Sequence, residues 1–140
     1  MANLKQRLDP DWSRHVDAAL LIARVVVGAF LIWGVLDNIL SSARMAEFAG
    51  FLAAKGFPLP HLMAPLSVWA QAAVGVALFL GVGTRWAGLV CAFNFVVAVV
   101  MVDAALGIRG AFPATALMLF GLLFAALGAG QWSVDRLLRR

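Results

Sequence analysis

Long runs of apolar side chains recur four times along the chain, and few charges interrupt them. Each run is close to the length, about 20 residues, that a helix needs to cross a hydrocarbon core roughly 30 Å thick. Lipid offers the backbone no hydrogen-bond partners, so a chain that crosses it satisfies its own groups by forming a helix. We therefore predict four membrane-spanning helices, at about residues 18–40, 62–82, 86–106 and 112–129.

The connections between these runs indicate how the helices pack. Residues 83–85 alone separate the second span from the third, and residues 107–111 separate the third from the fourth. Connections this short join antiparallel neighbours. We expect an all-α membrane protein whose single membrane domain, residues 18–130, is an antiparallel four-transmembrane-helix bundle. An interfacial N-terminal segment (residues 1–17) precedes it, and a basic tail (residues 131–140) follows.

A shorter element is predicted between the first and second spans, at residues 44–55. Ser41 or Ser42 can cap the start of this helix, and Gly56 is a typical end signal. Its apolar side chains share one helical face, so we expect a helix that lies in the membrane interface. These side chains are Met45, Phe48 and Leu52.

Composition and charge add a location and an orientation. Of the 140 residues 64% are hydrophobic and 13% charged, which leaves no room for a separate soluble domain. Most Lys and Arg residues lie outside the spans, where they anchor a protein to phospholipid head groups, so the net charge of +4 does not indicate nucleic-acid binding. The side that holds the N-terminus has more cations, which predicts cytoplasmic N- and C-termini. That side has Lys5, Arg7, Arg14, Arg85, Arg136, Arg139 and Arg140, and the other has Arg44, Lys55 and Arg109.

Three polar side chains inside the apolar runs form the first candidate site. Polar groups within a membrane are usually paired or functional. At a rise of about 1.5 Å per residue, Arg24 and Asn94 both lie roughly 10 Å from the cytoplasmic ends of their spans, so we expect them to be partners. Gln71 shares a stripe with Ser67 and Gly75 on the second span. Arg24, Gln71 and Asn94 could bind an anionic or quinone-like head group, or they could be a buried anchor and interhelical glue.

Asp37 and Asp103 form the second candidate site, because they lie at matched depth near the outer face. Two carboxylates there could bind a cation or a proton, and the alternative is solvation at the interface. Helical phase turns Asp37 away from the face that Arg24 shares with Gly28, Leu31, Val35 and Asn38. It also sets Asn94 and Asp103 half a turn apart.

Small residues recur at helical spacing and predict faces where helices pack closely. The positions that we expect to carry this packing are Gly28, Gly75, Gly121 and Ala125.

Redox and hydrolytic motifs are largely missing from the sequence. His15 and His61 flank spans on opposite sides of the membrane, which argues against a haem held within the bundle. Cys91 is the single cysteine, so an intramolecular disulfide and a CxxC thiol relay are excluded. No His/Cys cluster, glycine-rich phosphate loop or GxSxG occurs. We expect no metal and no resident cofactor, with a quinone or a bound lipid as the ligands to consider, and a chain that is not catalytic by itself.

Five stretches of sequence are informative as a set: LIAR (21–24), the Gly28 and Gly34 run, FAGFLAAKGFPLP (48–60), LFLGVGTRWAG (78–88) and GAGQWSVDRLL (128–138). Together, and in this order, they resemble the DoxX family of small four-span membrane proteins. The resemblance covers nearly everything from residue 18 onward, and Arg24 matches. It implies a bacterial inner-membrane four-helix bundle. Some members look like membrane subunits of thiosulfate:quinone oxidoreductases, and others are associated with redox-stress complexes.

The chain also departs from that family at two positions. Many members carry Lys near the position of Asp37 and Glu near that of Gln71, so the resemblance implies no Lys–Glu pair here.

Three functions are compatible with these features. The first is a non-catalytic accessory subunit that packs against a larger respiratory, photosynthetic or other redox membrane complex. The alternative is a quinone- or lipid-binding subunit of an oxidoreductase of the thiosulfate:quinone type. A small ion or metabolite carrier using Asp37 and Asp103 is the third. The expected partners are membrane lipids and other membrane protein subunits or a second copy, and no nucleic acid.

Overall fold

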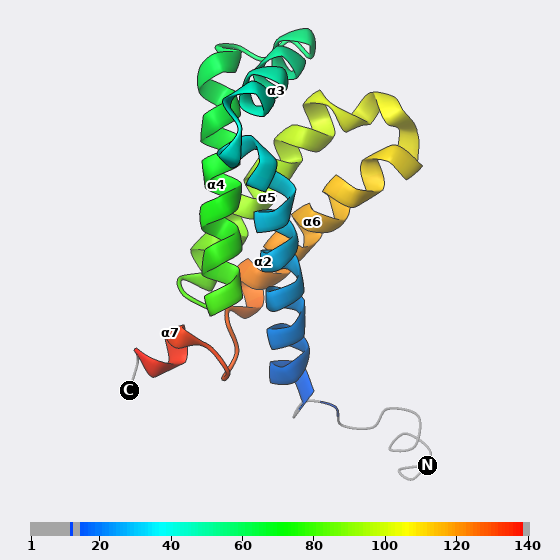
Figure 1. The fold of residues 1–140 in the computed structure, drawn as a ribbon. Helices are drawn as coiled ribbons and strands as arrows, with labels where there is room; N and C mark the ends of the chain where they lie inside the picture. The colour runs from blue at the N-terminus through cyan, green and yellow to red at the C-terminus, as the bar shows by residue number, and fades with distance from the viewer. Residues whose placement is uncertain (1–11, 13–14, 139–140) are drawn as a thin grey trace, which may run out of the picture.

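Helices make up almost all of the part of the chain that the computed structural model describes, which is Trp12 and residues 15–138 (Figure 1). Four stretches are long and apolar enough to cross a membrane: α2, α4, α5 and the continuous run of η2 and α6. The predicted all-α membrane fold is therefore confirmed. The elements are α2 (Val16–Leu40), α3 (Ser42–Ala54), α4 (Pro60–Leu80), α5 (Thr84–Met101), the 3-10 helix η2 (Asp103–Leu106), α6 (Gly107–Leu127) and α7 (Val134–Leu137).

The four long helices form two antiparallel pairs. Helix α2 packs mainly on α4, and α5 packs mainly on α6, with a smaller contact between α4 and α5. We call the end where α2 begins and α6 ends the terminal end, and the opposite end the distal end. The pair formed by α5 and α6 leans away from α2 and α4 toward the distal end (Figure 1). The two helix pairs thus lie farther apart at the distal end, which we call open, than at the terminal end, which we call closed (Figure 1).

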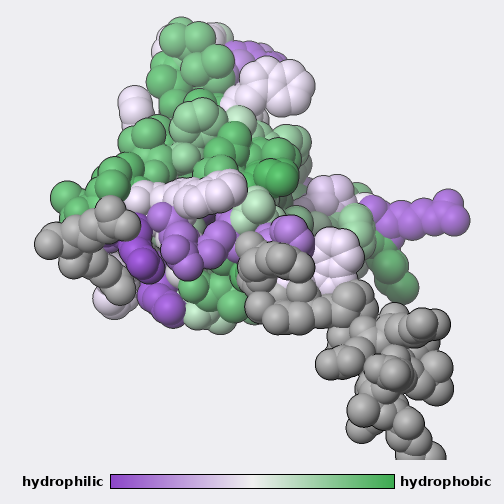
Figure 2. Space-filling view, turned by 90° about the horizontal axis from the view of Figure 1, so that it is seen from below, coloured by the Kyte–Doolittle hydropathy of each residue, from purple (hydrophilic) through white to green (hydrophobic). Residues whose placement is uncertain are grey.

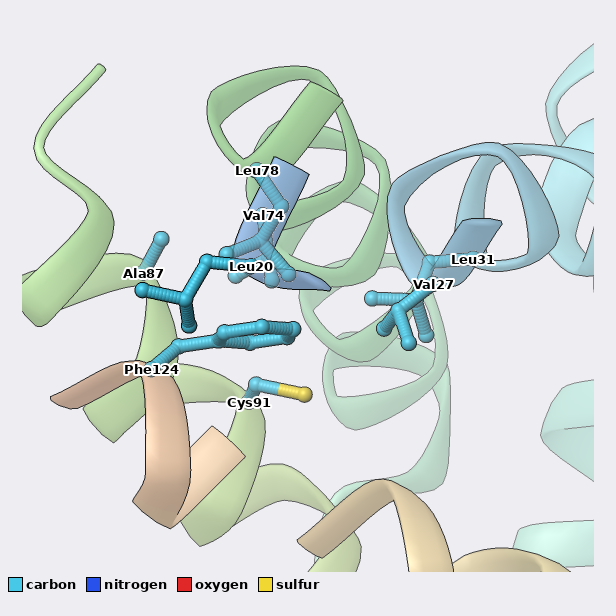
Figure 3. Close-up of a cluster of buried hydrophobic side chains, with 8 residues drawn as sticks. All are labelled: Leu20, Val27, Leu31, Val74, Leu78, Ala87, Cys91 and Phe124. Atoms are coloured by element: carbon cyan, nitrogen blue, oxygen red, sulfur yellow. The ribbon is translucent and has the colours of Figure 1, made fainter. Parts of the chain in front are cut away.

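One hydrophobic cluster joins all four long helices in the closed half (Figure 3). The Phe124 ring of α6 lies between Leu20 of α2 and Cys91 of α5. Phe124 is only 1% exposed, so it is the large side chain that closes the centre of the bundle. The other members of the cluster are Val27, Leu31, Val74, Leu78 and Ala87.

Helix α3 begins and ends as its sequence predicts. The side-chain oxygen of Ser41 accepts a hydrogen bond from the backbone N–H of Arg44, and Gly56 follows the last turn with a φ of 79°. A second apolar cluster fastens α3 to the start of α4, with buried Ala49, Leu52 and Ala64 at its centre. Helix α3 thus crosses the distal end of α4, where an interfacial helix would lie (Figure 1).

The turn between α5 and α6 differs from the prediction of a loop at residues 107–111. Helix α5 ends at Met101, the chain reverses through η2, and α6 begins at Gly107. The reversal uses the positive φ of 72° that Gly107 adopts. The connection is therefore earlier than expected, because the apolar residues 104–106 form the 3-10 helix that leads into α6 and not the end of the third span.

Candidate functional site

Arg24 is the most deeply buried charged residue of the described chain, with 0% of its surface exposed. Its Nη1 donates a hydrogen bond to the carbonyl oxygen of Leu78 over 3.0 Å, and its Nη2 donates to the carbonyl oxygen of Trp132 over 2.7 Å. Arg24 thereby ties α2 to the last turn of α4 and to the segment after α6. Among the described residues its Nε has no partner. We call this arrangement the Arg24 clasp.

Gly81 makes the space that the clasp needs. A β-carbon at Gly81 would collide with Nη1 of Arg24, and it would come within 2.7 Å of the side chain of Ser133. Gly81 also ends α4 with a φ of 74°, which side chains other than glycine rarely adopt. The turn between α4 and α5 is therefore shaped around the guanidinium.

Asp135 completes the clasp by holding the turn from the other side. Its Oδ1 accepts from the backbone N–H of Gly83 over 2.7 Å, and its Oδ2 accepts from that of Thr84 over 3.2 Å. The carboxylate thus satisfies N–H groups at the start of α5, where a negative charge also suits the helix dipole. It is also the negative charge that interacts with Arg24. Sequence reasoning did not find Asp135, because its partners are backbone groups.

The predicted partnership of Arg24 and Asn94 is wrong. Asn94 instead accepts a hydrogen bond, through Oδ1, from the hydroxyl of Ser67 over 3.0 Å. Gln71 donates from Nε2 to the same hydroxyl over 3.2 Å. Depth along the helix axis was the basis of the prediction, but α2 packs on α4, and Arg24 faces the turn after α4. We call Ser67, Gln71 and Asn94 the amide network.

A small hollow lies beside the amide network, between the two helix pairs. It holds essentially no volume that a water molecule could occupy, and its walls include Leu31, Gln71, Cys91, Asn94 and Phe95. Sites for small molecules usually measure about 300 Å³ or more. A quinone head group would fit here only if α4 and α5 moved apart. Gln71 and Asn94 thus face a shared space, and Arg24 does not.

Asp37 and Asp103 are not joined by any contact in the described chain. Asp37 forms a salt bridge with Arg44 over 3.0 Å, and Arg44 also pairs with Glu47 over 2.7 Å. The hydrogen bond to Asp37 and the charge of Glu47 raise the pKa of Arg44. Asp103 lies in η2, on the pair of helices that leans away. The two carboxylates therefore occupy separate surroundings.

Glycines allow close contact within each helix pair. A β-carbon at Gly28 would come within 2.6 Å of the carbonyl oxygen of Gly75, and one at Gly121 within 2.7 Å of that of Gly88. A β-carbon at Gly88 would come within 2.6 Å of the backbone nitrogen of Ala125. The four positions expected to carry helix packing thus lie where backbones touch. Gly88 was not among the predicted packing positions, although it lies at helical spacing after the turn at residues 81–83.

The described chain offers no ready metal centre. Among Trp12 and residues 15–138, no three His, Cys, Asp or Glu side chains come together as a group that could hold a metal ion.

Comparison with known proteins gives one match. No curated protein and no solved structure matched the chain. The DoxX family model matches residues 19–104, which include α3, α4, α5, Arg24 and the whole amide network. That match spans more than half of the sequence, so the chain belongs to the DoxX family.

Proposed function

We propose that this DoxX protein is a non-catalytic accessory subunit that packs against another membrane protein of a redox complex in the bacterial inner membrane. The observation that carries the proposal is the open distal end of the bundle. There, large apolar side chains of α5, η2 and α6 are exposed on the surface of the described chain. Ile108 is 90% exposed, and Val100, Leu106 and Phe112 are also exposed, to a smaller extent.

The composition of this distal hairpin suits a protein partner better than lipid alone. Small residues lie exposed among the bulky ones, at Ala104, Ala105, Gly107 and Gly110. Membrane helices associate through close van der Waals packing, and small residues let two backbones approach. A transmembrane helix of another subunit is therefore the occupant that we assign to the open side of α5 and α6.

The interior of the bundle supports a passive role. The Arg24 guanidinium and the Ser67 hydroxyl are engaged by protein groups, and the amides of Gln71 and Asn94 each make one bond within the network. The polar side chains that a substrate would have to contact are thus occupied in holding helices together.

The two alternatives have less support from the geometry. A quinone-binding role needs a pocket beside Gln71 and Asn94, where the hollow has essentially no room even for a water molecule. A carrier role needs Asp37 to face a cation, but this carboxylate is paired with Arg44.

Photo-crosslinking in native membranes tests the proposal. A photoreactive amino acid at Ile108 should give an adduct with a second, larger protein. The matched control is Ile22, which is also exposed, at 64%, but lies on α2 at the closed end. Adducts with lipid alone at Ile108, or the same protein adducts at both positions, would contradict the proposal. So would a chain that leaves its native membrane as a monomer in mild detergent.

A further inference from the structure

An open cavity of about 310 Å³ lies at the terminal end of the bundle. It is bounded by the start of α2, the start of α5, the end of α6 and the segment that leads into α7. Its polar walls come from Asp17, Arg85, Gln131, Ser133, Asp135 and Arg136. Seen from below, this end shows a group of hydrophilic side chains with apolar side chains next to it (Figure 2). A polar cavity of this size can hold a small charged group.

The two arginines of the cavity have N–H donors that make no hydrogen bond within the described residues. Arg85 uses Nη1 to cap the end of α6, donating to the carbonyl oxygens of Ala125 over 2.9 Å and Ala126 over 2.7 Å. Its Nε and Nη2 make no other hydrogen bond within the described residues, and neither does the side chain of Arg136. Two guanidinium groups therefore remain able to bind an oxyanion, which they recognise through paired N–H groups.

The two carboxylates of the cavity differ in the number of hydrogen bonds that they accept. Both oxygens of Asp135 accept bonds from the start of α5. Asp17 accepts through Oδ1 from the backbone N–H of Gln131 over 2.8 Å, and its Oδ2 accepts none from the described chain. One carboxylate oxygen is thus left to receive a cation. Two Arg and two Asp side chains give the walls a formal charge of zero, which suits a ligand that is also neutral overall.

Tryptophans place the cavity at the level of lipid head groups. Trp12, Trp86 and Trp132 are all exposed at the terminal end. Trp side chains gather where a membrane meets water, because they are apolar with one polar N–H group. Leu127, which also lines the cavity, offers an apolar edge for an acyl chain.

We propose that this cavity binds a phosphoethanolamine group, as carried by a phospholipid of the adjacent leaflet. Arg85 and Arg136 bind the phosphate, and Asp17 binds the ammonium. The presence of both positive and negative groups in the walls of one neutral cavity favours this zwitterion over inorganic phosphate, which would meet two carboxylates. The site lies at the opposite end from the proposed subunit contact and does not depend on it.

Native mass spectrometry of the full-length, delipidated protein in detergent tests the proposal. The probes are phosphatidylethanolamine, phosphatidylglycerol and phosphatidylcholine, added at equal concentration. We expect the wild type to retain phosphatidylethanolamine preferentially. Arg136→Gln should lower its retention about tenfold, since it removes one charged partner of the phosphate. Arg109→Gln removes the same charge at the distal end and should change nothing.

Asp17→Asn tests the second half of the site. The amide oxygen of Asn can still accept from the Gln131 N–H, so the fold is preserved, but the charge that faces the ammonium is lost. We expect the preference to move from phosphatidylethanolamine toward phosphatidylglycerol. Thermal melting of each variant in the same detergent shows that the bundle is intact.

Further measurements distinguish a lipid head group from a free ligand and define the results that would overturn the proposal. Soluble phosphoethanolamine that binds as well as the lipid would identify a free ligand of the same chemistry, whereas binding of the lipid alone identifies a head-group site. Equal retention of all three lipids would overturn the proposal. The proposal would also be overturned if Arg136→Gln folded normally and left the retention of phosphatidylethanolamine unchanged. The same holds if Arg109→Gln lowered this retention by the same factor as Arg136→Gln.

Discussion

Arg24 and Trp132 lie 108 positions apart in the sequence, yet Nη2 of Arg24 donates to the carbonyl oxygen of Trp132 over 2.7 Å. The neighbouring Nη1 donates to the carbonyl oxygen of Leu78. One buried cation thus holds the end of α4 and the segment after α6 against α2. A buried charge is tolerated where it is hydrogen-bonded and faces an opposite charge. The C-terminal segment and the buried guanidinium therefore stabilise each other.

Arg24→Ala should destabilise the bundle and release the C-terminal segment. The change leaves two carbonyl oxygens without their donor and opens a cavity, so we expect a loss of about 3 kcal/mol in the free energy of unfolding. Reversible unfolding in detergent measures this loss, and limited proteolysis should cut after residue 128 sooner than in the wild type. Arg109→Ala, an exposed site, is the control. Equal stability of the two variants would show that the clasp does not hold the fold.

Asp135→Asn should weaken the start of α5 by a smaller amount. Asn keeps one acceptor where Asp135 supplies two, to Gly83 and Thr84, and it removes the negative charge that interacts with Arg24. We expect a loss of about 1 kcal/mol, the usual effect of damaging a helix cap. Hydrogen exchange should show the loss as faster exchange of the amides at residues 83 and 84. Asp103→Asn is the matched control, and a similar effect there would argue against a capping role.

Gly28→Ala and Gly34→Ala separate helix contact from helix propensity. A β-carbon at Gly28 meets the backbone of α4, whereas one at Gly34 meets nothing within 4 Å. Overpacking of this kind costs about 1–3 kcal/mol, so Gly28→Ala should unfold at a lower denaturant concentration. Gly34→Ala should be neutral or slightly stabilising, because Ala favours helix. The idea of close α2–α4 contact would fail if both variants behaved alike.

Hydropathy and helical phase predicted the fold from the sequence, because the hydrophobicity and periodicity that place a helix in lipid can be read directly from a run of residues. The face of α2 that carries Arg24 was assigned in this way, and the structure buries Arg24, Gly28, Leu31 and Val35 together. Trp33, which lies four residues before Asp37 and so shares the opposite face with it, is 75% exposed.

Partner choice inside the bundle was much harder to predict. Depth along an axis does not say which helices are neighbours, so Asn94 was assigned to Arg24 although it lies beside Ser67 on α4. The groups that Arg24 does bind are backbone carbonyls, which every residue carries and no sequence pattern marks. The distal turn was misplaced for a related reason, since residues 104–106 are as apolar as a span.

Leu52→Ala should loosen α3 much more than Arg44→Gln. Leu52 is 5% exposed within the cluster that fastens α3 to α4, and emptying such a site costs about 2–3 kcal/mol. Arg44 is exposed, and exposed ion pairs contribute little. Cysteine accessibility along α3 would compare the two variants. A larger effect from Arg44→Gln would mean that charge, and not apolar packing, positions this helix.

The pH dependence of the Arg44 ion pair follows from the direction of its pKa shift. Hydrogen bonding to Asp37 raises the pKa of Arg44, so the contribution of the ion pair is fully present below the already strongly basic pKa of the unfolded state and is lost only as the pH rises through the still higher pKa of the folded state. We expect the difference in melting temperature between wild type and Arg44→Gln to stay constant from about pH 6 to about pH 9. A difference that disappears within this range would contradict the assignment.

Ser67 is the residue on which the amide network depends, because its hydroxyl donates to Asn94 and accepts from Gln71. Ser67→Ala removes both bonds, and an interhelical hydrogen bond in a membrane protein is worth about 1 kcal/mol. A double-mutant cycle with Asn94→Leu isolates this term, since the two single changes also alter packing. Thr115→Ala is the control, as its hydroxyl donates within its own helix, to the carbonyl oxygen of Ala111. We expect a coupling of about 1 kcal/mol for Ser67 with Asn94 and none for Thr115 with Asn94. Strict additivity of Ser67→Ala and Asn94→Leu would mean that shape alone, and not the hydrogen bond, holds α4 against α5.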